Sequence, residues 1–510
     1  MNVVGVIAEY NPFHNGHAYQ LRELKKRTGA DYIVIAMSGN YVQRGEPALV
    51  DKYARTQMAL ENGADLVLEL PVQWATASAE KFAQGGVELL AATGVVDFLG
   101  FGAEDDALSL MKELAQILVD EPESYRAALG EALRNGVNFP TARMQALSYY
   151  LTDKTLANDS DSSTSPDQFN LLPDLLSHPN NILALEYLKA LLRGNYAMES
   201  VLIPRIGDGY HEEDAQSEYA SATAIRRFLL SEYPSSTAIQ RILLSEYPSS
   251  IAITKEGLSD FPSITGSETT KKNPKKNLTL DVKTYLGKYL PTSCADILSQ
   301  YQSASRFLCE DDFSQILGYR LLSLRESGYD TYADISPELS SRIRNHVDEY
   351  QSFSQFCELL KTKELTYTRI SRALLHLILD IQDDQTPKSH FSFLPHANTD
   401  STMGIEPLDV SAISHIDSHI PYLRILGFRR SVEPLLHAMK QRATLPIITK
   451  MADAPRILDA KAIEILQKEI FVSDLYTQIA QNHRPSKNED KGRRNHRSSK
   501  NEVNHGLILI

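Results

Sequence analysis

Two histidines near the start of the chain have the spacing of a phosphate-binding pair. They stand in the segment His14-Asn15-Gly16-His17, which follows a short apolar run at 3–7 and precedes an amphipathic stretch that begins near Ala18. The run predicts a buried strand and the stretch predicts a helix. Free backbone N–H groups and the helix dipole favour an anion at a helix N-terminus. We therefore expect both imidazoles to donate hydrogen bonds to phosphate oxygens, and Gly16 to let the backbone approach the ligand closely.

A second group of residues has the types needed to hold a phosphate chain. Ser221, Thr223 and Arg226 open a predicted helix after a predicted strand at 201–206, and Arg205 lies at the end of that strand. Hydroxyls and a guanidinium at a helix start suit the β- and γ-phosphates of a nucleotide. Adenylyl transfer depends on positioning and charge neutralisation more than on covalent help from the protein. This chemistry favours Mg²⁺ as well, although no acidic cluster in the sequence marks a metal site.

A polar, glycine-bearing loop follows the second predicted strand. It contains Ser38, Asn40, Gln43 and Arg44. Ligand sites in open parallel sheets form at the carboxyl ends of strands, so we expect this loop to bind a substrate. A surface ion pair between Arg44 and Glu46 is the alternative interpretation.

Three single residues near predicted strand or helix ends have more than one interpretation. Gly102 ends the fourth predicted strand, where we expect it to let an adenine or ribose approach the backbone. Asn181 begins a predicted helix and suits capping as well as ligand binding. Asn11 either contacts a ligand or only shapes the turn together with Pro12.

Strand and helix patterns alternate in the part of the chain that carries these residues. Apolar runs lie at 3–7, 32–37, 66–70 and 95–101, with helical patterns between them. Such alternation predicts an α/β Rossmann-like domain with a parallel, doubly wound sheet. The carboxyl ends of the strands would then share one edge, which would bring the candidate residues together.

Composition limits the classes of function. A chain of 510 residues is too long for one core, so we expect two or three domains. No apolar run approaches the ~20 residues of a membrane-spanning helix, and the N-terminus lacks signal-peptide features, so we expect no membrane association. The three cysteines have no metal-ligand spacing, and so few cysteines fit a cytoplasmic protein. A net charge of −13 means that RNA binding would have to rest on local basic patches. Neither a P-loop nor a GxGxxG motif is present, which disfavours kinase and dinucleotide-binding functions.

The remaining chain divides by composition. The expected divisions are an ATP-binding domain (1–262), a lysine-rich linker (263–277), a mainly helical domain (278–480) and a polar, basic tail (481–510). The first domain carries a polar insert at about 153–167 and a tandem repeat at 228–255. The tail repeats NHRPSKNE as NHRSSKNE and cannot bury a core, so we expect it to be disordered.

With these residues described, the chain resembles one family. An HxGH motif directly after a first strand is the signature of the nucleotidylyltransferase superfamily. More specifically, the chain is similar to the bacterial tRNA(Met) cytidine acetate ligases, and the similarity runs from Gly5 to about Lys450. The matching stretches include GVIAEYNPFHNGHAYQL, MSGNYVQRGEPALVDKYAR, GADLVLELP, FGAE, NNILALEYLKAL, PRIGDGYH, ASATAIR, YTRISRALLHLIL, RILGFRR and LPIITK.

The resemblance implies an enzyme that activates acetate with ATP as acetyladenylate and transfers the acetyl group to N4 of the wobble cytidine of elongator tRNA(Met). Acetyl-CoA would not be needed. It also implies catalytic roles for His14 and His17 and an ATP pocket that includes Gly102, Asn181 and Arg205. The first segment of that implied pocket comprises Ile7, Ala8, Glu9, Tyr10, Asn11, Pro12, Phe13, His14, Asn15, Gly16, His17, Ala18, Tyr19 and Gln20.

An RNA substrate would need a basic surface on the helical domain. Arg369 and Arg372 on one predicted helix, and Arg424, Arg429 and Arg430 near another, are the candidates for phosphate contacts. Solvated charge on helix faces is the alternative interpretation of all five.

Two other functions stay open from the sequence. One is a small-molecule nucleotidylyltransferase that acts on a phosphorylated cofactor precursor, which would leave the long helical region without a role. The other is a non-catalytic, nucleotide-dependent RNA-binding protein.

Overall fold

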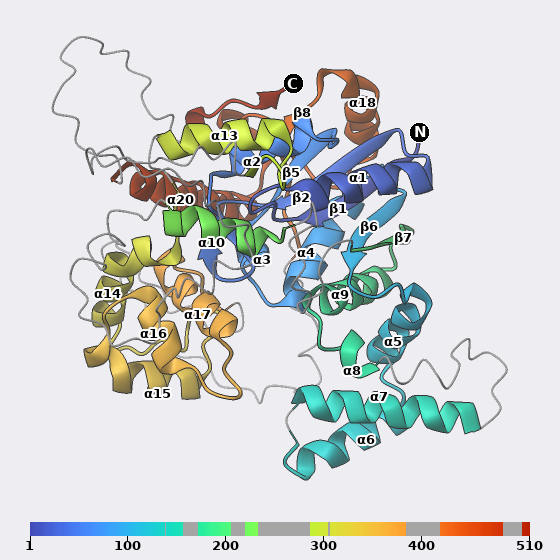
Figure 1. The fold of residues 1–510 in the computed structure, drawn as a ribbon, viewed down its shortest axis with the longest axis vertical. Helices are drawn as coiled ribbons and strands as arrows, with labels where there is room; N and C mark the ends of the chain where they lie inside the picture. Colours follow the sequence, from blue (N-terminus) through green and yellow to red (C-terminus); the bar gives the residue numbers. More distant parts are fainter. Residues whose placement is uncertain are drawn as a thin grey trace, which may run out of the picture.

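A central sheet with helices on both faces organises the protein (Figure 1). The computed structural model describes residues 1–137, 139–156, 172–205, 220–232, 286–303, 307–383, 419–482 and 502–510. Within these residues the strand order is β10-β8-β5-β2-β1-β6-β7, and β9 pairs with β8. The predicted Rossmann-like α/β architecture is confirmed.

The parallel part of the sheet comes from the first part of the chain. Its strands are β1 (Val3–Ala8), β2 (Tyr32–Ser38), β5 (Leu66–Leu70), β6 (Phe98–Ala103) and β7 (Glu199–Pro204). β1 pairs with β2 on one side and with β6 on the other, so the order of the strands reverses beside β1. Ligands bind such sheets outside the carboxyl ends of the strands at this switch point.

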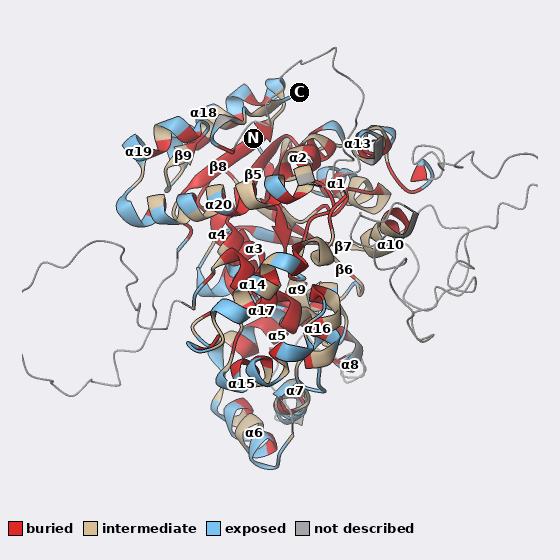
Figure 2. Ribbon diagram, turned by 90° about the vertical axis from the view of Figure 1, so that its left-hand side faces the viewer, coloured by how far each residue is buried: buried red, intermediate tan, exposed pale blue. Residues whose placement is uncertain are grey.

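Alternating side chains of β1 face the two helical layers. Val4 and Val6 share a core with Leu21, whereas Val3 shares the other core with Leu90. The first layer contains α1 (Asn15–Thr28), α2 (Lys52–Glu61), α10 (Ala222–Glu232) and α13 (Thr292–Ser303). The second contains α3 (Val72–Ala75), α4 (Ala79–Ala91), α5 (Leu108–Asp120), α9 (Pro179–Arg193) and α18 (Glu433–Arg442). Figure 2 shows the buried residues concentrated in the sheet between these layers.

A pair of helices extends from the sheet domain at the bottom of Figure 1. It consists of α6 (Glu123–Arg134) and α7 (Phe139–Leu156), and the short α8 (Leu172–Leu175) follows. The polar insert predicted at 153–167 begins inside α7, and most of it lies outside the described residues. Most of the tandem repeat and the whole predicted linker also lie outside them.

A helical unit follows, as predicted. It contains α14 (Ser314–Ser323), α15 (Pro337–His346), α16 (Phe353–Leu360) and α17 (Tyr367–Leu379). Phe356 and Leu374 lie in its core, to which Tyr476 of α20 (Ala460–Asn482) contributes. The remaining short elements are η3 (Glu310–Phe313), η4 (Val347–Glu349), η6 (Arg430–Val432), η7 (Met451–Asp453), α19 (Ala454–Ile457) and η8 (Glu502–Asn504).

The predicted domain division needs a correction. β8 (Leu423–Phe428) lies antiparallel to β5, and β10 (Ile508–Leu509) lies parallel to β8, so both complete the sheet of the first domain. β9 (Ile447–Ile448) extends it. The prediction of a disordered tail is therefore wrong for 502–510, while 483–501 lie outside the described residues. The buried Arg424 interrupts the apolar pattern of β8, which is why the sequence did not predict this strand.

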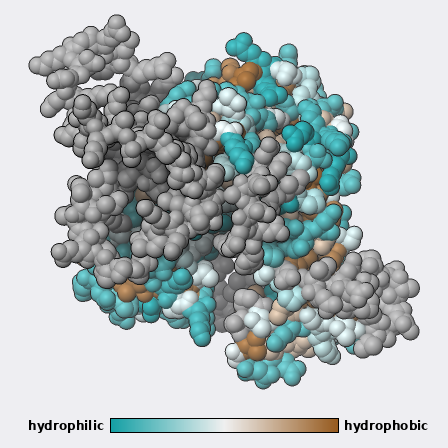
Figure 3. Space-filling model, in the orientation of Figure 1, coloured by the Kyte–Doolittle hydropathy of each residue, from teal (hydrophilic) through white to brown (hydrophobic). Residues whose placement is uncertain are grey.

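One face of the protein is mainly hydrophilic where the structure describes it (Figure 3). On the described part of the face in Figure 3, hydrophilic side chains predominate and hydrophobic ones form small separate groups. No helix among the described residues has the length and apolar character to cross a bilayer.

Candidate functional site

The first turn of α1 places the two histidines. His14 is the N-cap residue, and its Nδ1 accepts a hydrogen bond from the backbone N–H of Gly16 at 3.1 Å. His17 Nδ1 accepts one from the backbone N–H of His14 at 3.3 Å, and the two rings stack with centroids 3.7 Å apart. Because both Nδ1 atoms accept, each neutral ring carries its proton on Nε2. The pair therefore presents two N–H donors that the helix cap does not use.

The surroundings keep both rings uncharged near neutral pH. Burial, together with the positive charge of Arg205, lowers the pKa of His14 to about 3. Burial, His14 and Arg205 lower the pKa of His17 well below its ordinary value of 6.5. A neutral pair can donate hydrogen bonds to an anion while Arg205 supplies the positive potential.

Small and aromatic residues fix the orientation of these rings. A Cβ atom on Gly16 would lie 2.9 Å from Cε1 of His14, so glycine makes room for the ring itself. The rings of Tyr10 and Phe13 lie 4.9 and 5.5 Å from that of His17, centroid to centroid. Tyr10 is held at a positive φ of 50°, an uncommon conformation that the packed turn maintains.

The second predicted phosphate group lies against the histidine loop. Arg226 of α10 donates from Nη1 to the backbone oxygen of Asn11 at 2.9 Å, and its Nη2 pairs with Glu46 at 2.9 Å. The described residues form no ion pair between Arg44 and Glu46, the alternative considered from the sequence; Glu46 pairs with Arg226. Ser221 caps α10 by accepting from the N–H of Ala224 at 3.1 Å.

Within that group, Thr223 is half-buried in the first turn of α10. Asn11 is buried, and its Nδ2 has no hydrogen-bond partner among the described residues. Its Oδ1 accepts from the N–H of Leu49 at 2.8 Å, which fixes the amide. Asn11 thus shapes the turn and still leaves one donor unused at the site.

The loop after β2 is a small hairpin of β3 (Tyr41–Val42) and β4 (Glu46–Pro47). Gln43 N donates to Oε1 of Glu9 at 2.7 Å, which connects the hairpin to the end of β1. Asn40 Oδ1 accepts from the N–H of Lys52 at 2.8 Å. The hydroxyl of Ser38 is buried without a partner among the described residues, whereas Arg44 is exposed.

Helix α17 supports the same hairpin from behind. Ser371 Oγ donates to the backbone oxygen of Gly45 at 2.9 Å. A Cβ atom on Gly45 would lie 2.3 Å from the backbone N of Arg372, and Gly45 has a φ of +80°. Only glycine fits both constraints, so the loop and the helical unit are packed tightly together.

Arg55 holds the strand ends together, and the sequence analysis did not identify it. Its buried guanidinium donates to the backbone oxygens of Val50 at 3.2 Å, Glu9 at 2.6 Å, Ser38 at 3.1 Å and Gly39. It therefore fixes the turns that follow β1 and β2. The sequence contained one sign of this role: Arg55 falls on a side of its helix that small and apolar residues otherwise form.

The other side of the site lies at the ends of β6 and β7. A Cβ atom on Gly102 would lie 3.6 Å from Nε2 of Gln20 and 3.7 Å from Cγ of Arg205, so these three residues meet there. Asn181 is buried, and its Oδ1 accepts from the N–H groups of Glu104 at 2.9 Å and of Asp105 at 3.2 Å. It fixes the loop after β6 and does not cap α9, whose N-cap residue is His178.

Two of the arginines predicted to contact RNA are buried in ion pairs, which corrects that prediction. Arg372 Nε donates to Oδ2 of Asp334 at 3.0 Å. Arg424 Nη1 donates to Oε2 of Glu69 at 2.6 Å. Arg369, by contrast, is exposed at the start of α17.

The last two arginines lie at the other edge of the sheet. Because β8 is antiparallel to β5, its carboxyl end meets Leu66 at the beginning of β5. Arg429 and Arg430 follow directly, so they lie far from the ends of the parallel strands. Arg429 Nε donates to the backbone oxygen of Leu60 at 2.8 Å, and Arg430 is exposed.

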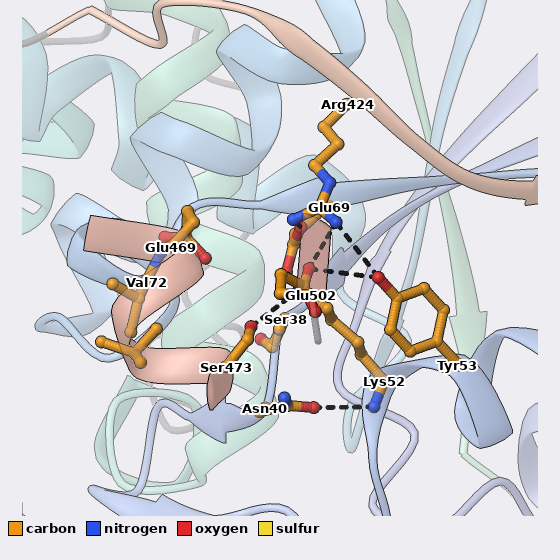
Figure 4. A network of polar contacts seen from close by, with 12 residues as sticks. Ser38, Asn40, Lys52, Tyr53, Glu69, Val72, Arg424, Glu469, Ser473 and Glu502 are labelled. Atoms are coloured by element: carbon orange, nitrogen blue, oxygen red, sulfur yellow. Dashed lines mark hydrogen bonds and ion pairs between the residues drawn. The ribbon is translucent and has the colours of Figure 1, made fainter. Parts of the chain in front are cut away.

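A buried charge network surrounds Arg424 (Figure 4). Lys52 Nζ lies 2.5 Å from Glu69 and 2.6 Å from Glu502, and Arg424 contacts both carboxylates. Burial raises the pKa of Glu502, but Lys52 and Arg424 outweigh it and hold that pKa below the ordinary value. Glu469 nearby accepts from the N–H of Val72, and burial and the charge of Glu69 raise its pKa.

Metal ions require a set of ligands, which in proteins come largely from His, Cys, Asp and Glu side chains. The described residues contain no group of three or more His, Cys, Asp or Glu side chains that could hold a metal ion. The Mg²⁺ that the chemistry favours stays a prediction.

Comparisons with known proteins agree with the geometry. The model of the family described as HIGH Nucleotidyl Transferase matches residues 1–396 and 392–491. The chain is 33% identical over 483 residues to the tRNA(Met) cytidine acetate ligase of Acetivibrio thermocellus, covering 94% of this chain and 96% of the relative. It is 32% identical over 499 residues to that of Halothermothrix orenii, covering 97% and 98%. The crystal structure of Thermotoga maritima TmcAL bound with alpha-thio ATP matches with a TM-score of 0.70 and 26% identity, over 94% of this chain and 95% of that one.

Proposed function

Because the chain belongs to the HIGH nucleotidyl transferase family and, within it, to the tRNA(Met) cytidine acetate ligases, we propose that it activates acetate with ATP and acetylates N4 of the wobble cytidine of elongator tRNA(Met). Acetyladenylate is the intermediate, with pyrophosphate leaving in the first step and AMP in the second. These substrates suit a cytoplasmic enzyme that does not use acetyl-CoA. The observation that carries the proposal is the pair of Nε2 donors beside the switch point of the sheet, for which the described part of the chain provides no acceptor.

In the first step an acetate oxygen attacks the α-phosphate. His14 and His17 donate hydrogen bonds to phosphate oxygens, where negative charge builds up as pyrophosphate leaves. The N-terminus of α1 adds its dipole at the same point. These groups stabilise developing charge without exchanging protons, which suits rings whose pKa values are low.

The other residues position the reactants. Gly102, Gln20 and Arg205 form the side on which the nucleoside would lie. Ser221, Thr223 and Arg226 flank the histidine loop on the side of the β- and γ-phosphates, although Arg226 must share its hydrogen bonds with Asn11. The candidate acetate site is the segment from Ser38 at the end of β2 to the β3–β4 hairpin, where the Ser38 hydroxyl has no hydrogen-bond partner among the described residues.

Two measurements on the purified protein test the proposal. Labelled pyrophosphate should exchange into ATP only when acetate is present. Incubation of tRNA(Met) transcripts with ATP and acetate should yield N4-acetylcytidine by nucleoside mass spectrometry. Exchange that requires a phosphorylated metabolite would instead support a small-molecule nucleotidylyltransferase, and ATP-sensitive tRNA binding without any exchange would support a non-catalytic protein.

A further inference from the structure

Glu9 belongs to the segment expected in the ATP pocket, yet the charge of its carboxylate does not suit a contact with phosphates. It follows β1 directly, in the same loop as His14. Its Oε1 accepts from the N–H of Gln43 at 2.7 Å, and no described residue donates to its Oε2. The side chain keeps part of its surface exposed. Because a carboxylate repels a triphosphate, the presence of Glu9 at this position requires another explanation.

A closed set of contacts holds Glu9 in place. Gln43 connects it to the hairpin, Glu46 of the hairpin pairs with Arg226, and Arg226 donates back to the backbone of Asn11 in the loop that carries Glu9. The backbone oxygen of Glu9 accepts from Arg55. The carboxylate therefore sits on a fixed support, as a group that must meet a reacting atom would need.

The charges near Glu9 suit a neutral, hydrogen-bonding ligand. Burial raises the pKa of Glu9, and the N–H of Gln43 and the positive charge of Arg44 oppose that rise. Arg44 is exposed, and its side chain has no hydrogen-bond partner among the described residues. Arg44 directly follows Gln43, whose N–H contacts Glu9, so the hairpin brings a set of donors near the acceptor at the end of β1.

This pattern matches one edge of cytosine. Its N4 amino group donates, and its N3 and O2 atoms accept, so a carboxylate suits N4 and a guanidinium suits N3 or O2. Uracil has an acceptor at the position of N4, so two acceptors would face each other and the carboxylate would repel it. We propose that Glu9 and Arg44 bind the amino-bearing edge of the target cytosine and that Glu9 accepts the N4 proton during acetyl transfer.

The inference rests on the proposed function and concerns its second step. N4 attacks the acetyl carbon of acetyladenylate, a new N–C bond forms, and the bond from that carbon to the phosphate oxygen of AMP breaks. The N4 proton passes to Oε2 of Glu9, and AMP leaves with the electron pair of the broken bond. Proton transfer by a positioned side chain contributes typically about 10²–10⁴-fold.

The test separates the two steps in the full-length enzyme. For Glu9→Gln, acetate-dependent pyrophosphate exchange and single-turnover transfer from preformed acetyladenylate to tRNA(Met) are measured side by side. We expect the ratio of transfer rate to exchange rate to fall by about 10² or more. In the matched control Glu88→Gln, a buried glutamate of α4 that accepts from the N–H of Ile420, the ratio stays at the wild-type value.

The outcomes are distinguishable. An unchanged ratio in Glu9→Gln, whether both rates persist or both fall together, overturns the inference and leaves the proposed function intact. Absence of acetate-dependent exchange in the wild-type enzyme overturns the proposed function and the inference with it.

A binding experiment covers the case in which Glu9→Gln is poorly folded. The wild-type enzyme should bind tRNA(Met) at least about 5-fold more tightly than the same tRNA with uridine at the wobble position. Arg44→Ala should reduce this preference, and Lys440→Ala, at an exposed position of α18, should retain it. Equal affinity of the wild-type enzyme for the two tRNAs overturns the inference.

Discussion

Two polar regions lie near the carboxyl ends of the parallel strands, and their hydrogen bonds differ in kind. Around His14 and His17, the two Nε2 donors have no hydrogen-bond partner among the described residues. Around Arg424, each charge contacts an opposite charge, and Figure 4 shows the closed network that results. Unused donors cost stability and are useful only to a ligand, whereas paired charges can fix segments that lie far apart in sequence. The donors without partners therefore mark the ligand site, and the paired charges mark the structure that supports it.

The largest expected effect comes from breaking the network. Arg424→Met leaves Glu69 and Glu502 buried with only Lys52 to balance them, so we expect the free energy of unfolding in urea to fall by about 3–5 kcal/mol. Arg430→Met, at an exposed position, should change it by less than about 0.5 kcal/mol. Equal stabilities of the two variants would contradict a structural role for the network.

At the histidines we expect a large loss of activity and only a small loss of stability. His17→Ala should slow acetate-dependent pyrophosphate exchange by about 10²–10³-fold because a donor to developing charge is lost. Unfolding should change by only about 1 kcal/mol, through the weakened helix cap. His437→Ala on α18 is the control and should leave both unchanged. Exchange at the wild-type rate in His17→Ala would show that the phosphates bind elsewhere.

Glu469 makes the network sensitive to pH. Its pKa is raised in the folded state, so above its ordinary value of 4.5 the folded protein retains a proton that the unfolded chain releases. Stability should therefore fall as pH rises from about 4.5 towards neutrality, by up to about 1.4 kcal/mol per unit. Glu469→Gln should remove this dependence in urea unfolding at a series of pH values. An identical slope in the variant would assign the dependence to other groups.

The smallest expected effect concerns two arginines of helix α17, one exposed and one in an ion pair. Arg369 is exposed, whereas Arg372 pairs with Asp334. Arg369→Ala should weaken tRNA binding a few-fold and lower the slope of log affinity against log salt by about 0.7–0.9, as loss of one phosphate contact would. Lys440→Ala, at an exposed position of α18, serves as the control. An unchanged slope for Arg369→Ala would place the RNA surface elsewhere.

The sequence predicted the parts of the molecule that depend on neighbouring residues. The strand–turn–helix pattern at 3–28 was sufficient to locate β1, the histidines and the edge of the sheet. Long-range pairings were not predictable. Arg424 has the type of an RNA contact, and only its placement opposite Glu69 shows that it is buried. Arg55 likewise becomes recognisable only when the carbonyl groups around it are known.

The position of β8 and β10 at the end of the sheet has a consequence during protein synthesis. Five parallel strands are complete once the ribosome has added residue 204, yet the side of β5 stays without a neighbour for more than two hundred further residues. An unpaired strand edge invites pairing with another nascent chain. Prompt translation, or a chaperone that shields this edge, would therefore decide how much newly made polypeptide escapes aggregation.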